Sequence, residues 1–360
     1  MVHREFIGDE KQKYYHHRDK ARLNKRGRSG FTSMSVIIDG MDQANTKLPN
    51  PVRHSKDTEP LFQQAVHVTG VLDHGGEVPA QVILEDGRAT KDANNTISSL
   101  CHVLRVHQHS GPLPEVLYIQ LDNATGENKN RFVLFFCALL VGAGVFEKVK
   151  LSFLPVGHTH EDIDQLFSRF AESLRRMDCF SWDDLERIIR SSYHSENGSQ
   201  PEVVRNPKVA DFKGWMEFKK IDISGHNAPM CFKFQKDQST TDVLMYARGR
   251  TSVKVVAGQP DEQSTWFPED GYVVVSVEEA SKLWTQDLFR VPPRDLPFTD
   301  IRHTIDKYVD LGLFGDAHSA EWDADLLAAE EDIARQCDVC TSLRSEESAT
   351  NQVCSQSPIV

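Results

Sequence analysis

The first 200 residues alternate between two hydrophobic patterns: short continuous apolar runs, and longer stretches with apolar residues three or four apart. The runs "SMSVIIDG" and "EVLYIQLDN" stop at Asp-Gly and Asp-Asn, and with "FEKVKLSFLPV" they are typical of buried strands. The runs "LFQQAVHVTGVLD" and "VPAQVILED" flank the turn "HGGE" and predict a β-hairpin. Helical spacing predicts helices over 89–110, 126–144 and 160–177.

A strand, a hairpin and then alternating helices and strands predict an α/β fold, with a mixed five-stranded sheet flanked by helices. This is the element order of ribonuclease H-like folds. After about residue 206, short strand-like blocks such as "DFKGWMEF", "MCFKFQKD" and "VLMYARGR" are separated by Gly, Asn and Ser. The predicted units are a basic helical segment (1–33), a ribonuclease H-like core (34–200), a small β-rich C-terminal appendage (201–315) and an acidic, partly disordered tail (316–360).

Composition describes an ordinary globular protein, because 39% of its 360 residues are hydrophobic and 26% are charged. The longest apolar run, 132–146, is shorter than the roughly 20 residues that a membrane helix needs. The N-terminal residues do not have the pattern of a secretory signal. We therefore expect a nuclear or cytoplasmic protein with no membrane partner.

Charge is unevenly distributed along a chain whose net charge is −12. The segment Lys11–Arg28 carries eight Lys and Arg residues and one acid, Asp19. Such a segment is a solvated basic helix, a nuclear-import signal or a contact to the phosphate backbone of DNA. In the last case the contacting side chains are expected to include Lys20, Arg22, Lys25 and Arg26.

The stretch "GHTHEDID" admits a zinc site of the metallo-β-lactamase type, in which His158, His160 and Asp162 would be ligands. That motif requires a sixth-position histidine, and this chain has Ile163 there. Ile163 also lies in the middle of the apolar stripe of the predicted helix, which favours a core role. A zinc hydrolase is therefore a minor alternative.

Carboxylates at strand ends suggest a different metal site. Asp39 ends the first predicted strand and Asp122 ends the fourth, where open sheets build their ligand sites. Two such carboxylates and a third from a helix can hold two divalent cations about 4 Å apart, one activating an attacking hydroxyl and the other stabilising a leaving oxygen. Oxygen ligands favour Mg²⁺ or Mn²⁺.

The third acid is Glu161, Asp162 or Asp164. If Ile163 marks the buried face, a rotation of about 100° per residue turns Glu161 toward solvent and sets the two aspartates on either side of that face. Asp162 has the capping-box spacing from Thr159, so it could serve the helix end alone. This favours Asp164 and leaves Asp162 as its competitor.

Three motifs, "IIDGMDQ", "LDNATGENKNR" and "LPVGHTHEDIDQLFSRF", resemble a family of transposon-derived proteins with a ribonuclease H-like core of the DDE/D transposase type. The resemblance covers about 34–176 and implies that Asp164, seven residues after Gly157, is the third acid. It also implies an acid/base role for His158. Asn123, Asn128 and Lys129 follow Asp122 at a predicted helix start, where amides and a cation can meet phosphate.

The resulting hypothesis is a transposase-derived, divalent-metal-dependent polynucleotidyl transferase or nuclease that acts on DNA phosphodiesters. The alternative is a domesticated or truncated remnant that binds nucleic acid or protein without catalysis. The acidic balance and the lack of an evident recognition module before the core favour the remnant, whereas the retained acids favour the enzyme. Target sequence and oligomeric state are left open.

Overall fold

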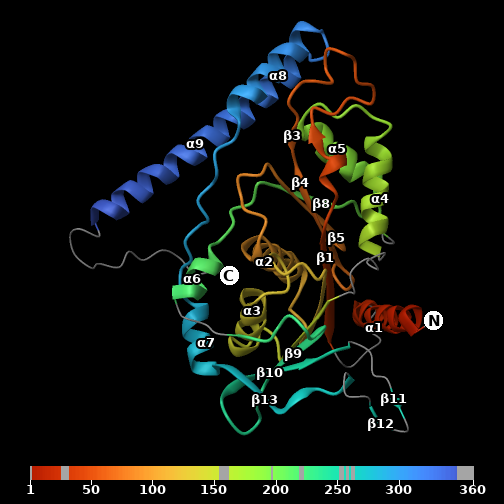
Figure 1. The fold of residues 1–360 in the computed structure, drawn as a ribbon, viewed down its shortest axis with the longest axis vertical. Helices are drawn as coiled ribbons and strands as arrows, with labels where there is room; N and C mark the ends of the chain where they lie inside the picture. Colours follow the sequence, from red (N-terminus) through yellow and green to blue (C-terminus); the bar gives the residue numbers. More distant parts are fainter. Residues whose placement is uncertain are drawn as a thin grey trace.

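A computed structural model describes residues 2–25, 32–153, 162–195, 198–218, 223–250, 255–256, 259–260 and 264–346. A mixed sheet runs through the centre of this part of the chain, with helices on both sides (Figure 1). The strands lie in the order β13 (Phe267–Ser276), β10 (Asp242–Arg248), β9 (Cys231–Lys236), β7 (Lys148–Phe153), β6 (Val116–Leu121), β1 (Ser33–Gly40), β4 (His67–Asp73), β5 (Ala80–Glu85) and β8 (Glu202–Arg205).

The predicted hairpin is the antiparallel pair β4 and β5, and β4 also pairs antiparallel with β1. On the other side of β1, strands β6 and β7 run parallel to it. Strands β1, β5, β6 and β7 therefore run in one direction, as does β8, which pairs parallel with β5. Their carboxyl ends lie along the same edge of the sheet.

The predicted class, a mixed sheet flanked by helices, is confirmed, but the prediction of five strands was wrong. The sheet has nine strands, because β8 joins one side and β9, β10 and β13 extend the other. Antiparallel pairing with β9 satisfies backbone groups on the outer side of β7 that a five-stranded sheet would leave unpaired. The residues from 201 to 315 thus contribute strands to both sides of the central sheet.

The helices are α1 (Val2–Lys25), α2 (Ala93–Ser110), α3 (Arg131–Gly142), α4 (Asp162–Leu174), α5 (Trp182–Ser192), α6 (Phe212–Phe218), α7 (Val277–Trp284), α8 (Phe298–Asp310) and α9 (Asp316–Glu346). The strand prediction for "DFKGWMEF" was wrong, since this segment forms α6. The Asp211 carboxylate accepts from the Gly214 amide there, and Phe212 and Met216 are buried four residues apart. Short pairs β2–β3 (Lys47–Leu48, Gln64–Ala65) and β11–β12 (Val255–Val256, Gln259–Pro260) and a 3-10 turn η1 (Gln43–Asn45) complete the described elements.

Two apolar cores lie on opposite faces of the sheet (Figure 1). Met34, Val36 and Ile38 of β1 pack in the core that includes α2 and α3, whereas Ile37 packs in the core that includes α4 and α5. Successive side chains of a strand point to opposite faces, so Asp39 is on the α4 side. In the part of the chain that is described, no helix is long and apolar enough to cross a membrane.

Helix α4 sits close to β4 because residue 70 is glycine. A Cβ atom at Gly70 would lie 2.7 Å from Cε1 of Phe167 and 3.2 Å from Cδ1 of Ile163, both of which are buried core residues of α4. Gly70 is also the antiparallel partner of Asp39. The missing side chain therefore sets how near the start of α4 comes to the end of β1.

We predict that Gly70→Ala lowers the free energy of unfolding by about 1–3 kcal/mol, because the added methyl group overpacks the contact with the Phe167 ring. Urea denaturation of the full chain measures this. Phe167→Leu supplies room, so the double variant should lose less than the sum of the two single losses. Additive losses would show that the ring contact does not limit the approach of α4.

Candidate functional site

Asp39 and Asp122 stand side by side at the carboxyl end of the parallel pair β1–β6. Ile37 is paired with Gln120, and the same register two residues further on aligns Asp39 with Asp122. Alternation puts both side chains on the face of α4, and neighbouring strands are about 4.8 Å apart. Two carboxylates from adjacent strands therefore share one small region of the sheet edge.

The electrostatics of Asp39 connect all three favoured acids. Burial and the negative charges of Asp122 and Asp164 together raise the pKa of Asp39 to about 6, against a hydrogen bond from the Gly40 amide that lowers it. The Lys91 ammonium also lowers this pKa. Asp122, at the end of β6, and Asp164, on α4, are thus each close enough to Asp39 of β1 for their charges to act on it.

Asp162 has different surroundings from Asp164. Its carboxylate accepts from the Tyr14 hydroxyl and lies 3.7 Å from Arg18 Nη1 and 3.7 Å from His74 Nε2. Tyr14 and Arg18 belong to α1, so Asp162 ties the start of α4 to α1 and to the β4–β5 turn. This structural role favours Asp164 as the third acid, in line with the helical-phase argument.

Asp122 is held by groups that follow it in sequence. Its Oδ1 atom accepts from the Ala124 amide at 3.0 Å and from the Asn128 side chain, whose own oxygen accepts from the Thr96 hydroxyl at 2.7 Å. Within the described residues the side-chain oxygen of Asn123 is buried without a hydrogen-bond partner. These contacts orient Asp122 and leave an unused acceptor beside it.

Lys129 does not lie where the sequence analysis expected a phosphate contact. It is only 1% exposed, and its ammonium lies 3.5 Å from Met230 Sδ and 5.4 Å from the centre of the Phe153 ring. Burial lowers its pKa. We therefore assign Lys129 a packing role beneath the site.

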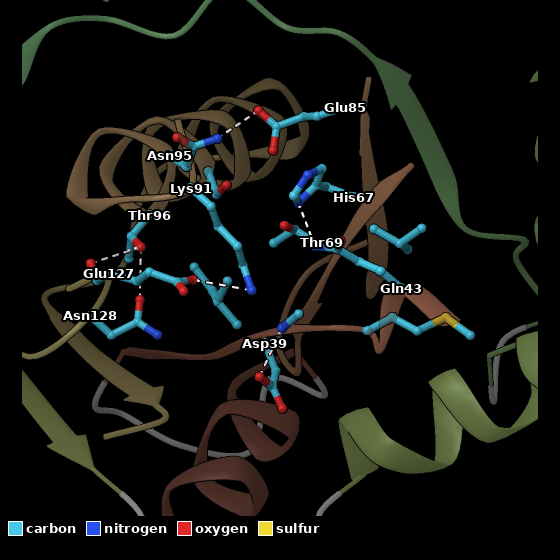
Figure 2. A pocket seen from close by; sticks show the side chains of 15 residues that line it. Asp39, Gln43, His67, Thr69, Glu85, Lys91, Asn95, Thr96, Glu127 and Asn128 are labelled. Atoms are coloured by element: carbon cyan, nitrogen blue, oxygen red, sulfur yellow. Dashed lines mark hydrogen bonds and ion pairs between the residues drawn. The ribbon is translucent and has the colours of Figure 1, made fainter. Parts of the chain in front are cut away.

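A pocket extends from Asp39 toward α2, and Figure 2 shows the side chains that line it. Lys91, just before α2, reaches between Asp39 and Glu127, and its Nζ atom lies 3.3 Å from Glu127 Oε2. On the opposite wall, Glu85 ends β5 and accepts from the Asn95 amide group at 2.7 Å. Burial raises the pKa of Glu85 to about 7.

Three residues of this pocket, Glu85, Lys91 and His67, were not predicted from the sequence. The His67 ring contacts the Gln43 side chain at 2.7 Å. Glu85 carries the same signal as Asp39, an acid at the end of a buried strand, and could have been found by it. Lys91 lies in a loop with no pattern of its own. Its role depends on tertiary contacts.

A metal site requires several donor side chains close together among the residues that the structure describes. Among these residues, no group of three His, Cys, Asp or Glu side chains is arranged to hold a common metal ion. The donor chemistry of Asp39, Asp122 and Asp164 nevertheless fits Mg²⁺ or Mn²⁺, because carboxylate oxygens are the ligands that hard cations prefer. Their mutual repulsion is the condition that a bound cation relieves.

Several predicted residues lie outside the described residues. These are His158, His160, Glu161 and Arg26, so the histidines of the zinc alternative are among them. Ile163 is 1% exposed and confirms the core role expected from the sequence.

In α1, Lys20 and Arg22 are partly buried. Lys20 lies near enough to Lys13 to lower its pKa, and Arg22 contributes to the lowered pKa of His74. Lys25 is the last residue of the same helix, and its side chain lies outside what the structure describes.

Comparison with known proteins gives one family and one distant structural likeness. No curated protein matches the chain. A solved structure described as "Crystal structure of the Mos1 Strand Transfer Complex" is 14% identical, covers 49% of this chain and 52% of its own, and has a TM-score of 0.27. The chain thus spans about half the length of that solved chain. The family model "Domain of unknown function (DUF7869)" matches residues 56–252, more than half of the sequence, and the chain belongs to this family.

Proposed function

We propose that this protein is a ribonuclease H-like, divalent-metal-dependent polynucleotidyl transferase or nuclease that acts on DNA phosphodiesters. One observation carries the proposal. Asp39 and Asp122 are aligned on neighbouring parallel strands, and the charges of both Asp122 and Asp164 raise the pKa of Asp39. Three carboxylates that repel one another in a partly buried site cost stability, and a cation offsets that cost.

The strand order supports the proposal. The segment β5–β4–β1–β6–β7, with β4 antiparallel to its neighbours, follows the element order that the sequence resemblance implies for a ribonuclease H-like core. Open sheets bind ligands at the carboxyl ends of their parallel strands. Asp39, Glu85 and Asp122 all lie at that edge.

The residues of the site have distinct parts in this function. Asp39, Asp122 and Asp164 supply the negative charge for Mg²⁺ or Mn²⁺, and Asn128 fixes the orientation of Asp122. When bound, such cations activate the attacking hydroxyl and stabilise the leaving oxygen of a phosphodiester. Asn123 directly follows Asp122, and among the described residues its buried side-chain oxygen has no hydrogen-bond partner.

We predict that Asp122→Asn removes the stabilisation that Mg²⁺ or Mn²⁺ gives the parent protein. A ligand that binds only the folded state at about 100 times its Kd stabilises it by about 2.7 kcal/mol. Asparagine keeps the acceptor oxygen for Ala124 and Asn128, so in chelator the variant should be as stable as the parent or more so. Thermal melts with and without metal measure this, and Asp164→Asn should behave in the same way.

Asp162→Asn is the matched control, because its contacts with Tyr14 and Arg18 are structural. It should lower stability with and without metal and leave the metal response intact. A nicking assay on supercoiled DNA then tests catalysis. A parent protein that neither responds to metal nor nicks DNA would refute the enzyme and support the non-catalytic remnant.

We predict a pH dependence from the raised pKa of Asp39, about 6 in the folded state against 3.8 for an unperturbed side chain. Below about pH 4 the carboxyl is protonated in both states and costs nothing. As pH rises from about 4 to about 6, the unfolded state loses this proton while the folded state still holds it, so stability falls over that range and levels off above it. The loss by pH 8 is on the order of 2–3 kcal/mol.

Asp39→Asn does not titrate, so in chelator it should be more stable than the parent at pH 8 and nearly equal to it at about pH 3.5. Urea denaturation at the two pH values gives the comparison, and Glu85 titrates equally in both proteins. Adding Mg²⁺ at pH 8 should reverse the order, since only the parent gains a ligand. A difference between the two proteins that stays constant with pH would contradict the coupling of Asp39 to its acidic neighbours.

A further inference from the structure

Four lysines gather on the same face of the sheet as the acids. Lys148 and Lys150 lie on β7, Lys233 lies on β9, and Lys13 reaches this face from α1. The sheet register puts Lys150 beside Lys233. We call these four residues the basic platform.

Alternation along the strands fixes the face. Val149 and Leu151 of β7 and Phe232 and Phe234 of β9 pack into the core on the α3 side, so the intervening lysines point the other way. Tyr118 of β6 is paired with Lys150, and Asp122 lies four residues further along β6 on that face. The acids are therefore about 13 Å from the platform row, at about 3.3 Å per residue.

The platform lysines repel one another instead of forming ion pairs. In the part of the chain that is described, no carboxylate is paired with any of the four. Burial and the charges of Lys13, Lys148 and Arg248 together lower the pKa of Lys150 to about 8. Burial and nearby cations, Arg248 among them, also lower the pKa values of Lys13 and Lys233.

Aromatic rings stabilise these cations where acids do not. The Lys233 ammonium lies 3.8 Å from the centre of the Tyr246 ring and 5.1 Å from that of Trp266, and Lys150 lies 5.8 Å from that of Tyr118. Cation–π contacts keep a lysine charged without neutralising it. Lys148 and Tyr246 also line a hollow together with Lys236 and with two acids, Glu147 and Asp237.

An accumulation of unneutralised cations is unexpected on a chain whose net charge is −12. It is the surface that a polyanion complements, since each phosphate bound by a lysine also relieves the repulsion between lysines. The acids of the site also require such a surface. Asp39, Asp122 and Asp164 repel a phosphodiester, so a substrate held beside them needs binding energy from another part of the same face.

We propose that the basic platform binds the phosphate backbone of duplex DNA and holds a neighbouring phosphodiester at the acids of the site. This inference rests on the proposed function for its substrate and adds the surface that binds it. The basic residues selected from the sequence of the N-terminal segment were Lys20, Arg22, Lys25 and Arg26. The platform instead combines Lys13 of α1 with strands β7 and β9.

The test is DNA binding by the full chain in chelator, measured by fluorescence anisotropy with a labelled 30-base-pair duplex over a range of salt concentrations. The triple variant Lys148→Gln, Lys150→Gln and Lys233→Gln should bind about tenfold or more weakly than the parent. Its plot of log affinity against log salt should be shallower by about 2–3, since each lost phosphate contact removes about 0.9 from the slope. The variant should fold, because neutral side chains remove repulsion.

The control triple variant Lys47→Gln, Lys56→Gln and Lys208→Gln changes the net charge equally at exposed positions elsewhere. It should retain the parent's affinity and slope. Equal losses in the two triple variants, or no loss in the platform variant, would overturn the proposal. If the platform variant fails to fold, the rate of chemical acetylation of Lys150 and Lys233 in the parent protein is measured with and without DNA. Bound DNA should slow the acetylation of both lysines. A rate that DNA leaves unchanged would contradict the platform.

DNA binding by the platform and DNA cleavage at the acids are measured separately, so either proposal can fail alone. A parent protein that binds DNA through the platform but never nicks it would refute the enzyme and keep the platform. A platform variant that binds and nicks DNA as well as the parent would refute the platform and keep the enzyme.

Discussion

The parallel pairing of β1 with β6 is the constraint on which the site depends. Its register aligns the last residues of the two strands, so that Asp39 and Asp122 share one edge and one face of the sheet. Backbone hydrogen bonds fix this alignment, and a shift by one residue would turn either carboxylate to the opposite face. The sheet therefore holds two like charges together against their repulsion.

The packing of α4 against the sheet places the third acid, Asp164. Helix α4 reaches the end of β1 because Gly70 leaves room for the rings and methyl groups of α4, and Asp162 anchors the helix start to Tyr14 and Arg18 of α1. Asp164, two residues further along the helix, lies where its charge acts on Asp39. Asp162 positions the helix, and Asp164 contributes to the charge of the site.

Features governed by local pattern were predictable from the sequence. The strands that carry Asp39 and Asp122 were identified from apolar runs ending in an acid, and the buried position of Ile163 followed from helical phase. The strands beyond β7 were not foreseen as part of the same sheet, because pairing between β7 and β9 depends on contacts across about 80 residues of chain. The register that lines up Lys150 with Lys233, and the position of Lys91 beside Asp39, are tertiary properties with no local signature.

The two charged clusters are best understood together. Acids at one end of the sheet face and lysines about 13 Å away each raise the free energy of the folded protein by like-charge repulsion. Attraction between the clusters gives little relief, because they are about 13 Å apart and solvent screens charges over about 10 Å. A metal ion at the acids would relieve one cluster, and a chain of phosphates on the lysines would relieve the other. The proposed ligand, a phosphodiester strand bound with divalent cations, carries charges of both signs, and its binding would relieve the repulsion within both clusters.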